Sequence, residues 1–382
     1  MLAVGVAAQA AGTVFVSTPA FLIPLLHTER GLSLAEAGTL AAAPTFGLVL
    51  TLIAWGALVD RIGERWVIAG GLVLVALAAA AATVAEGYAW LGFFLLLGGA
   101  ASGSTSAASG RVVVGWFPKD RRGFAMGIRQ MSQPLGVTIA ALAVPPLAQQ
   151  SIATAIVLSL ALTAVLAVAS ALVIVNPPRP SRADAAATTN PYRASSYLWR
   201  IHGVSALLVV PQFTLSTFGL VWMTVGLGIA APVAGIIVGV SQFIGAIGRI
   251  GAGQLSDRVG SRVRPLRWVA VAGIVAMGLL AITSLDAPVL ACVIYVIATT
   301  ISVADNGLAF TSVAEVAGPF WSGRALGAQN TGQFIAASGV GPAIGALIGV
   351  AGYPVAFAVS ALAAAIAVPF VPSRAAELSA EH

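Results

Sequence analysis

Charged residues are scarce in this chain. They make up 8% of its 382 residues, and the mean hydropathy is +0.97. A soluble domain carries about 25% charged residues, so this sequence lacks the polar side chains needed to cover a water-facing surface. The basic residues punctuate apolar runs and form no patch, which argues against a nucleic-acid partner. We therefore expect an integral membrane protein.

Cysteine and lysine are nearly absent, and each absence excludes a class of site. The single Cys292 lies in an apolar run, which excludes an internal disulfide and a cysteine metal cluster. The only lysine, Lys119, follows Pro118, and the sequence contains no G-x-x-x-x-G-K-[ST] loop for ATP. It also contains no HExxH motif, paired Cys/His set or Ser–His–Asp arrangement. We expect no enzyme activity, no cofactor and no metal.

Long apolar runs fill most of the chain. A helix needs about 20 mostly apolar residues to cross ~30 Å of hydrocarbon. On that basis the sequence predicts an all-α protein with twelve transmembrane helices, at 3–26, 35–58, 66–86, 89–115, 123–146, 152–175, 199–223, 228–254, 267–285, 288–314, 325–349 and 353–371. The polar stretch 176–198 is predicted to be a linker between two six-helix bundles, 1–175 and 199–382.

The distribution of arginine predicts the orientation. Arg30 is the only basic residue in the loops assigned to one side, whereas the other side carries most of the arginines. Basic loops face the cytoplasm. Both termini and the linker are therefore expected there, in the plasma membrane of a bacterium.

One short loop occurs twice. Residues 56–65 and 253–262 both follow the pattern G-x-L-x-D-R-x-G-x-R, 197 residues apart. A second match, offset by 200, places Gly, Ala and Gly at 123, 125 and 127 and again at 323, 325 and 327. Such a duplication predicts parallel repeats about an axis normal to the membrane.

The repeated loop resembles the signature motif of the major facilitator superfamily, and the resemblance covers essentially the whole chain. It implies two six-helix bundles around a central cavity, with substrate bound where the bundles meet. It also implies a cytoplasmic gate, which in family members locks helix ends when the transporter faces outward. The residues that match are Asp60, Arg61, Arg65, Asp257, Arg258 and Arg262. Alternatively, these charges only set the topology. Arg111 is expected to bond the Asp60 loop, and Glu315 to be a further gate acid.

Ionisable residues inside apolar spans usually face a cavity or a partner. Arg249 resembles an arginine of the monocarboxylate, oxalate and nitrate porters of the superfamily, where it contacts the anion. Its guanidinium suits a carboxylate because it donates two parallel hydrogen bonds. The nitrate porters carry a second arginine where this chain has Leu52. The alternative for Arg249 is a bond to a helix end or to a gate acid. Arg129 has polar neighbours and is expected to contact substrate or to form a gate salt bridge.

Asp305 is the only acid well inside a predicted span. Burial disfavours a charged carboxylate, so this group could carry a coupled proton; alternatively it is a permanent partner for an arginine. Further predicted substrate contacts are Gln9, Thr13, Gln212, Gln242 and Asn330. The Ser and Thr residues of such stripes also often bond only to their own helix.

We expect a monomeric secondary active transporter of a small organic anion, a carboxylate, that works by alternating access and is coupled to a proton or another ion. One alternative is a proton-driven multidrug efflux antiporter. Another, from a different class, is a sensor that binds a ligand on the same scaffold without transporting it.

Overall fold

The structure is a computed structural model that describes residues 1–28, 32, 34–177, 190–283 and 287–380. Arg30 and most of the expected linker lie outside the described residues. Contacts between Cα atoms divide the chain into two compact units. Unit 1 comprises 1–116, 131–187 and 319–331, and unit 2 comprises 117–130, 188–318 and 332–382. The bundle and linker boundaries expected from the sequence stay a prediction. Each unit also includes one short segment from the other half of the sequence, 319–331 in unit 1 and 117–130 in unit 2.

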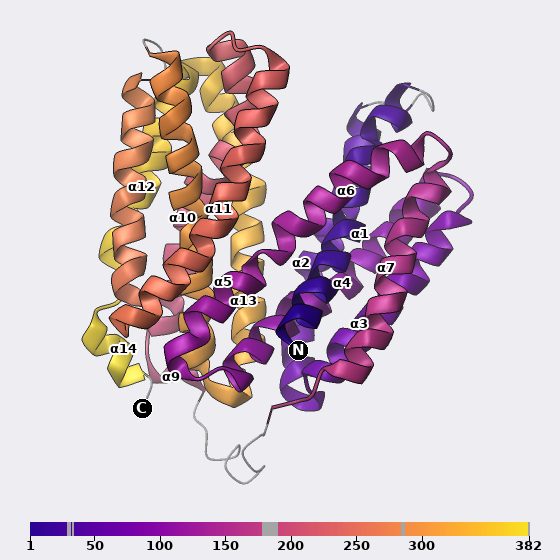
Figure 1. The fold of residues 1–382 in the computed structure, drawn as a ribbon, viewed down its shortest axis with the longest axis horizontal. Helices are drawn as coiled ribbons and strands as arrows, with labels where there is room; N and C mark the ends of the chain where they lie inside the picture. The colour runs from indigo at the N-terminus through magenta and orange to yellow at the C-terminus, as the bar shows by residue number, and fades with distance from the viewer. Residues whose placement is uncertain (29–31, 33, 178–189, 284–286, 381–382) are drawn as a thin grey trace. The chain divides into compact units, whose positions relative to one another are not determined.

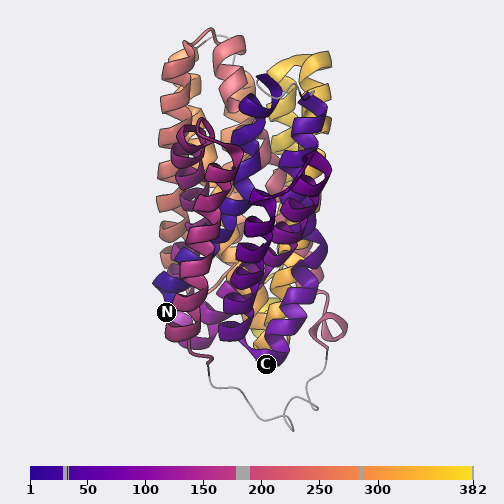
Figure 2. The ribbon, with the colours of Figure 1, turned by 90° about the vertical axis from the view of Figure 1, so that its right-hand side faces the viewer.

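Unit 1 is a bundle of long apolar helices (Figure 1, Figure 2). Its helices are α1 (Leu2–Thr28), α2 (Leu34–Ile62), α3 (Glu64–Thr83), α4 (Tyr88–Trp116), α6 (Ser132–Ala148) and α7 (Ile152–Val173). The main packing pairs are α2 with α4, α3 with α4 and α7, and α1 with α6. Small residues permit the closest of these crossings: a Cβ atom at Gly47 of α2 would overlap the carbonyl oxygen of Leu96 on α4.

Unit 2 contains the remaining helices, which are packed around a second apolar core. They are α5 (Arg122–Gln130), α9 (Pro191–Ala194), α10 (Tyr197–Val221), α11 (Ala231–Val259), α12 (Val263–Thr283), most of α13 (Pro288–Phe370) and α14 (Arg374–Ala380). A short 3-10 turn, η1 (Lys119–Arg121), precedes α5, and a π-helical turn, η2 (Trp222–Gly226), follows α10. The core is built on Trp222, Tyr295 and Phe357, and the ring of Trp222 contacts the rings of the other two.

Helix α13 contains 83 residues but is not one rod. A straight helix of that length would extend about 125 Å, roughly four times the hydrocarbon thickness. The backbone breaks at Gly318 (φ 69°) and Gly352 (φ 80°), where glycine tolerates a positive φ. The three resulting segments match the tenth, eleventh and twelfth predicted spans. Together with the other long helices they confirm the predicted all-α fold of twelve membrane-spanning helices, counted within the described ranges.

The fifth span departs from the prediction of a continuous helix over 123–146. It breaks at a turn on Met131 into α5 and α6. Pro134 carries no N–H, so the carbonyl of Gln130 has no donor four residues further on. The break therefore leaves an unused acceptor at the end of α5, which becomes part of the site described below.

Candidate functional site

The first motif loop builds a buried polar cluster in unit 1, the Asp60 cluster: Asp60, Glu64, Arg111, Gly323 and Arg324. Both carboxylate oxygens of Asp60 accept backbone N–H groups, Oδ1 from Gly323 at 3.0 Å and Oδ2 from Arg324 at 3.1 Å. Arg111 bridges the acids, with Nη1 2.8 Å from Asp60 and Nε 3.0 Å from Glu64. The structure thus brings Arg111 to Asp60 and adds an acid that the motif pattern did not include.

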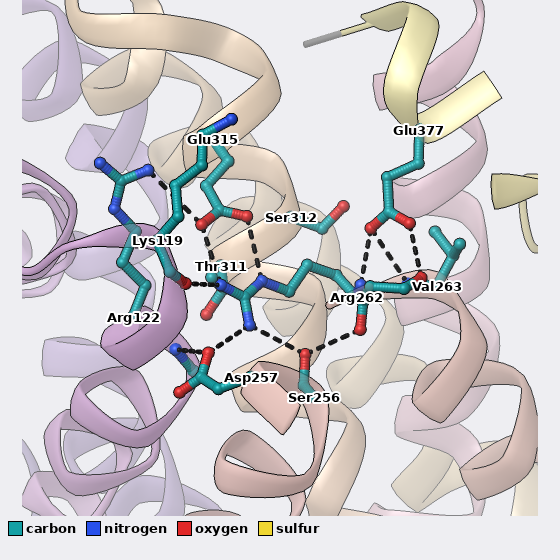
Figure 3. Close-up of polar contacts among 12 residues, drawn as sticks. Lys119, Arg122, Ser256, Asp257, Arg262, Val263, Thr311, Ser312, Glu315 and Glu377 are labelled. Carbon is teal, nitrogen blue, oxygen red and sulfur yellow. Dashed lines mark hydrogen bonds and ion pairs between the residues drawn. The ribbon is translucent and has the colours of Figure 1, made fainter. Parts of the chain in front are cut away.

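The second motif loop builds the corresponding cluster in unit 2, the Asp257 cluster: Lys119, Gly123, Phe124, Asp257, Arg262 and Glu315 (Figure 3). Asp257 accepts the N–H groups of Gly123 at 2.9 Å and Phe124 at 2.8 Å, at the start of α5. A helix N-terminus has unpaired N–H groups and a positive dipole end, so a carboxylate is a favourable cap there. The two repeated aspartates make the same contact with matching segments, 123–124 and 323–324.

Arg262 is the centre of the Asp257 cluster. Its guanidinium donates to Asp257, to both oxygens of Glu315 at 3.0 Å each, and to the carbonyl of Lys119 at 2.7 Å. Burial lowers the pKa of Arg262, but the hydrogen bonds and charges of Glu315 and Asp257 raise it above its ordinary value. Arg262 therefore stays charged and can hold both acids at once.

The remaining motif arginines are Arg61, Arg65 and Arg258. Arg61 and Arg258 are both exposed. Arg65 donates its backbone N–H to the Oδ1 of Asn176 at 2.9 Å and stacks its guanidinium on Trp66. Their expected gate roles stay a prediction. Sequence reasoning missed Glu64, although it directly follows the motif glycine Gly63, and it missed Asn176.

Paired glycines let the helices meet at each cluster. A Cβ atom at Gly253 would overlap the carbonyl oxygen of Gly123, and one at Gly56 would overlap that of Gly323. Each of the two short segments contributed by the other half of the sequence is therefore held by a carboxylate cap and by direct backbone contact.

These contacts predict a position-specific stability effect on α11. Gly253→Ala should lower the melting temperature of the purified protein, because overpacking costs about 1–3 kcal/mol. Gly251→Ala is the matched control: it lies two residues away, and a Cβ atom there would have none of the described residues within 4 Å. Alanine also gains about 0.8–1 kcal/mol over glycine in a helix interior. Equal melting temperatures for the two variants would contradict the close crossing.

The buried ionisable residues Arg249 and Asp305 lie in unit 2, near enough for their charges to interact. Arg249 is 7% exposed and Asp305 1% exposed, and each acts on the other through its charge. They form no hydrogen bond with each other: among the described residues, both Asp305 oxygens lack a donor and the Nε of Arg249 lacks an acceptor. The Nη1 of Arg249 donates to the Gln130 carbonyl at 2.8 Å, which is the acceptor left unused by Pro134. The bond to Gln130 at the end of α5 is a hydrogen bond from Arg249 to a helix end, as considered from the sequence. It uses only the Nη1 donor of Arg249.

Arg129 lies one residue before that carbonyl, at the end of α5. It is 1% exposed, donates Nη1 to the Oε1 of Gln130 at 3.3 Å, and places its guanidinium 5.3 Å from the ring centre of Phe310. Gln130 thus accepts hydrogen bonds from both buried arginines. Its side chain and backbone link the end of α5 to α11.

The predicted polar residues are divided between the units. In unit 1, Gln9 accepts the hydroxyl of Ser109 at 2.9 Å, while Thr13 and Asn330 bond to carbonyls of their own helices. In unit 2, Gln212 accepts the Asn306 amide at 3.1 Å, and Gln242 is half-buried on α11. The back-bonding considered for the Ser and Thr residues therefore holds for Thr13, and Asn330 makes a bond of the same kind.

Asn306 extends this polar network beside Asp305. Its Oδ1 accepts the amide of Gln333 at 2.8 Å, and the same Gln333 amide donates to Ser205 at 2.7 Å. The neighbour of the buried acid is thus held by side chains from other stretches of unit 2. Asn306 was not among the predicted site residues, although it follows Asp305 directly.

Twelve apolar helices within the described ranges, two repeated carboxylate caps and a buried arginine–aspartate pair are typical of a multi-pass membrane transporter. A sequence profile described as Major Facilitator Superfamily matches residues 4–339. The chain belongs to the Major Facilitator Superfamily.

Two sequence relatives support this assignment. The MFS-type transporters Rv2994 and MT3072, from two strains of Mycobacterium tuberculosis, are each 45% identical to this chain over 376 residues. The alignment covers 98% of this chain and 84% of each relative. Both names include the word "uncharacterized", so they give the transporter family and no substrate.

Solved structures show the same fold. The transporter FucP in its outward conformation superposes with a TM-score of 0.77 and 16% identity, over 97% of both chains. The human organic anion transporter MFSD10 (TETRAN) superposes with a TM-score of 0.71 and 16% identity, over 97% of this chain and 98% of that one. At this identity the likeness establishes the fold alone.

Proposed function

We propose that the chain carries a small organic anion, a carboxylate, across the membrane by alternating access and couples its movement to a proton. The observation that supports this most is the Arg249–Asp305 pair. A buried cation with an unused donor lies within the range of charge interaction of a buried acid with two unused acceptors, within the part of the chain that the structure describes. A purely structural ion pair would satisfy these groups with each other.

Arg249 is proposed to bind the substrate carboxylate. A guanidinium has five N–H donors. Arg249 uses Nη1 on Gln130, while its Nε has no acceptor among the residues described. The free edge of the fork suits the two oxygens of a carboxylate. Arg249 can therefore bind an anion without releasing the Gln130 carbonyl.

Asp305 is proposed to carry the proton. An ionised carboxylate that accepts no hydrogen bond is costly in a buried site, and binding a proton removes that cost. An anion at Arg249 cancels the positive charge that acts on Asp305, so the binding of anion and proton would favour each other. This mutual effect is the thermodynamic basis for coupled transport.

Other residues complete the proposal. Arg129, Gln212 and Gln242 of unit 2 are further proposed substrate contacts, and Gln9, Thr13 and Asn330 of unit 1 remain predicted ones. The Asp60 and Asp257 clusters are proposed to lock and release the cytoplasmic side of a monomer in the plasma membrane, with Arg61, Arg65 and Arg258 at its rim. The same fold occurs in FucP, a fucose:proton symporter, and in MFSD10, an organic anion transporter. Fold likeness does not choose between such cargoes.

A thermal-shift screen tests the substrate class. We expect at least one of acetate, lactate, pyruvate, oxalate and succinate to raise the melting temperature of the purified protein. A ligand at 100 times its Kd stabilises by about 2.7 kcal/mol. A response only to lipophilic cations such as tetraphenylphosphonium would contradict the anion proposal and favour drug efflux. Uptake of the labelled hit into proteoliposomes separates a transporter from a sensor.

A further inference from the structure

The C-terminal helix α14 reaches the second motif loop through one acid. Glu377 is 4% exposed, and its Oε1 accepts the backbone N–H of Arg262 at 2.6 Å and that of Val263 at 3.3 Å. Its Oε2 accepts the hydroxyl of Ser261 at 2.6 Å. Figure 3 shows the carboxylate pointing at this turn from the side opposite Asp257 and Glu315. Glu377 thus contacts three consecutive residues of the loop.

The contact lies at the N-terminus of α12, where a carboxylate stabilises a helix most. Helix α12 begins at Val263, and the first N–H groups of a helix have no partner within it. A carboxylate at this position makes charge-assisted hydrogen bonds and favours the positive end of the helix dipole. Glu377 is therefore the cap of α12, provided by a helix at the other end of the C-terminal half of the sequence.

The capped residue is the one on which the Asp257 cluster depends. Arg262 contacts Asp257, Glu315 and Lys119 through its side chain while Glu377 holds its backbone N–H. A long side chain reaches three partners at once only if its backbone is fixed. Loss of the cap would let the backbone at the start of α12 move. The Arg262 side chain would then no longer be held in position to reach its three partners.

Unit 1 repeats this arrangement with a different residue. Asn176, three residues after the end of α7, accepts the backbone N–H of Arg65 at 2.9 Å. Arg65 and Arg262 are the matching last residues of the two motif loops. Trp116 donates to the carbonyl of Val175 at 2.9 Å and holds the segment that carries Asn176. An amide in one unit and a carboxylate in the other thus cap the same motif position, each from just beyond the last span of its half.

We propose that Glu377 is a positioning residue of the gate: α14 holds the motif backbone so that Arg262 can lock the Asp257 cluster, and release of α14 promotes its opening. This inference rests on the gate role proposed above for that cluster, and it is independent of the substrate. It assigns the C-terminal helix a function in conformational control.

Site-specific labelling tests the inference. Ala314 is fully buried beside Glu315, so Ala314→Cys in a Cys292→Ser background reports opening of the cluster through its rate of reaction with N-ethylmaleimide in detergent. Glu377→Ala should raise this rate about tenfold, the effect of losing a charged helix cap on an opening equilibrium. Glu377→Gln keeps one acceptor oxygen and should give a smaller increase. Ser379→Ala, on the exposed side of α14, should leave the rate unchanged.

A second variant distinguishes the gate role of the Asp257 cluster from the positioning role of Glu377. Asp257→Asn should also accelerate labelling, because it weakens the cluster directly. Fast labelling in Asp257→Asn with background labelling in Glu377→Ala would overturn the positioning role and leave the gate intact. Background labelling in both would overturn the gate role itself. A lower melting temperature for Glu377→Ala without faster labelling would show a merely structural cap and would also overturn the inference.

Discussion

Asp305→Asn is expected to abolish accumulation of the transported carboxylate driven by a pH gradient in proteoliposomes, while exchange of the same carboxylate continues. Asparagine has nearly the same shape but cannot release a proton. With one proton per monoanion, a gradient of one pH unit supports about tenfold accumulation, and this ratio should fall to about one in the variant. The readout is the inside-to-outside ratio of labelled carboxylate at steady state.

The control for this variant is Asp120→Asn, which removes an exposed acid near the Asp257 cluster. It should retain the full gradient-driven ratio. If Asp305→Asn also retained it, Asp305 would not carry the proton, and its charge would serve only to balance Arg249.

Arg249→Ala is expected to weaken carboxylate binding. Truncating one partner of a buried, hydrogen-bonded charge pair costs about 2–5 kcal/mol, which is at least a roughly 30-fold loss of affinity at about 1.4 kcal/mol per factor of ten. At about 100 times the native Kd, stabilisation by the carboxylate found in the screen should fall from about 2.7 kcal/mol to about 0.9 kcal/mol or less. Arg249→Lys keeps the charge but loses the planar fork, so its response should be intermediate.

The matched control is Arg264→Ala, which removes an exposed arginine at the start of α12 and should leave the carboxylate response unchanged. Arg249→Ala also frees the Gln130 carbonyl, so its melting temperature without ligand should fall. The assignment of Arg249 rests on the ligand-induced shift and not on that fall. A full shift in Arg249→Ala would show that the anion binds elsewhere.

The repeated motif predicted much of the site because its chemistry is local. A carboxylate at the end of one span caps the start of another, and the pattern places Asp60 and Asp257 at equivalent positions in two repeats. Arg249 and Asp305 were identifiable because ionisable residues are rare inside apolar runs. Their interaction through charge was not predictable, since they lie on different helices and no spacing rule relates them.

The residues that the sequence did not indicate are those whose partners are set by tertiary packing. Glu377 lies in a short polar tail with no motif around it, and only the position of α14 on the loop shows its role. The break at Met131 had a local signal in Pro134, but membrane-spanning helices also tolerate an interior proline without ending there. The use of the freed Gln130 carbonyl by Arg249 depends on how α5 crosses α11.

Proton movement driven by the anion is the most direct test of proton coupling. Proteoliposomes that enclose a fluorescent pH indicator receive the carboxylate identified by the screen, with protein-free liposomes as the control for passive entry of the neutral acid. The proposed coupling predicts protein-dependent acidification of the interior that follows uptake of the label and is lost in Asp305→Asn. Protein-dependent uptake with no change in internal pH would contradict it.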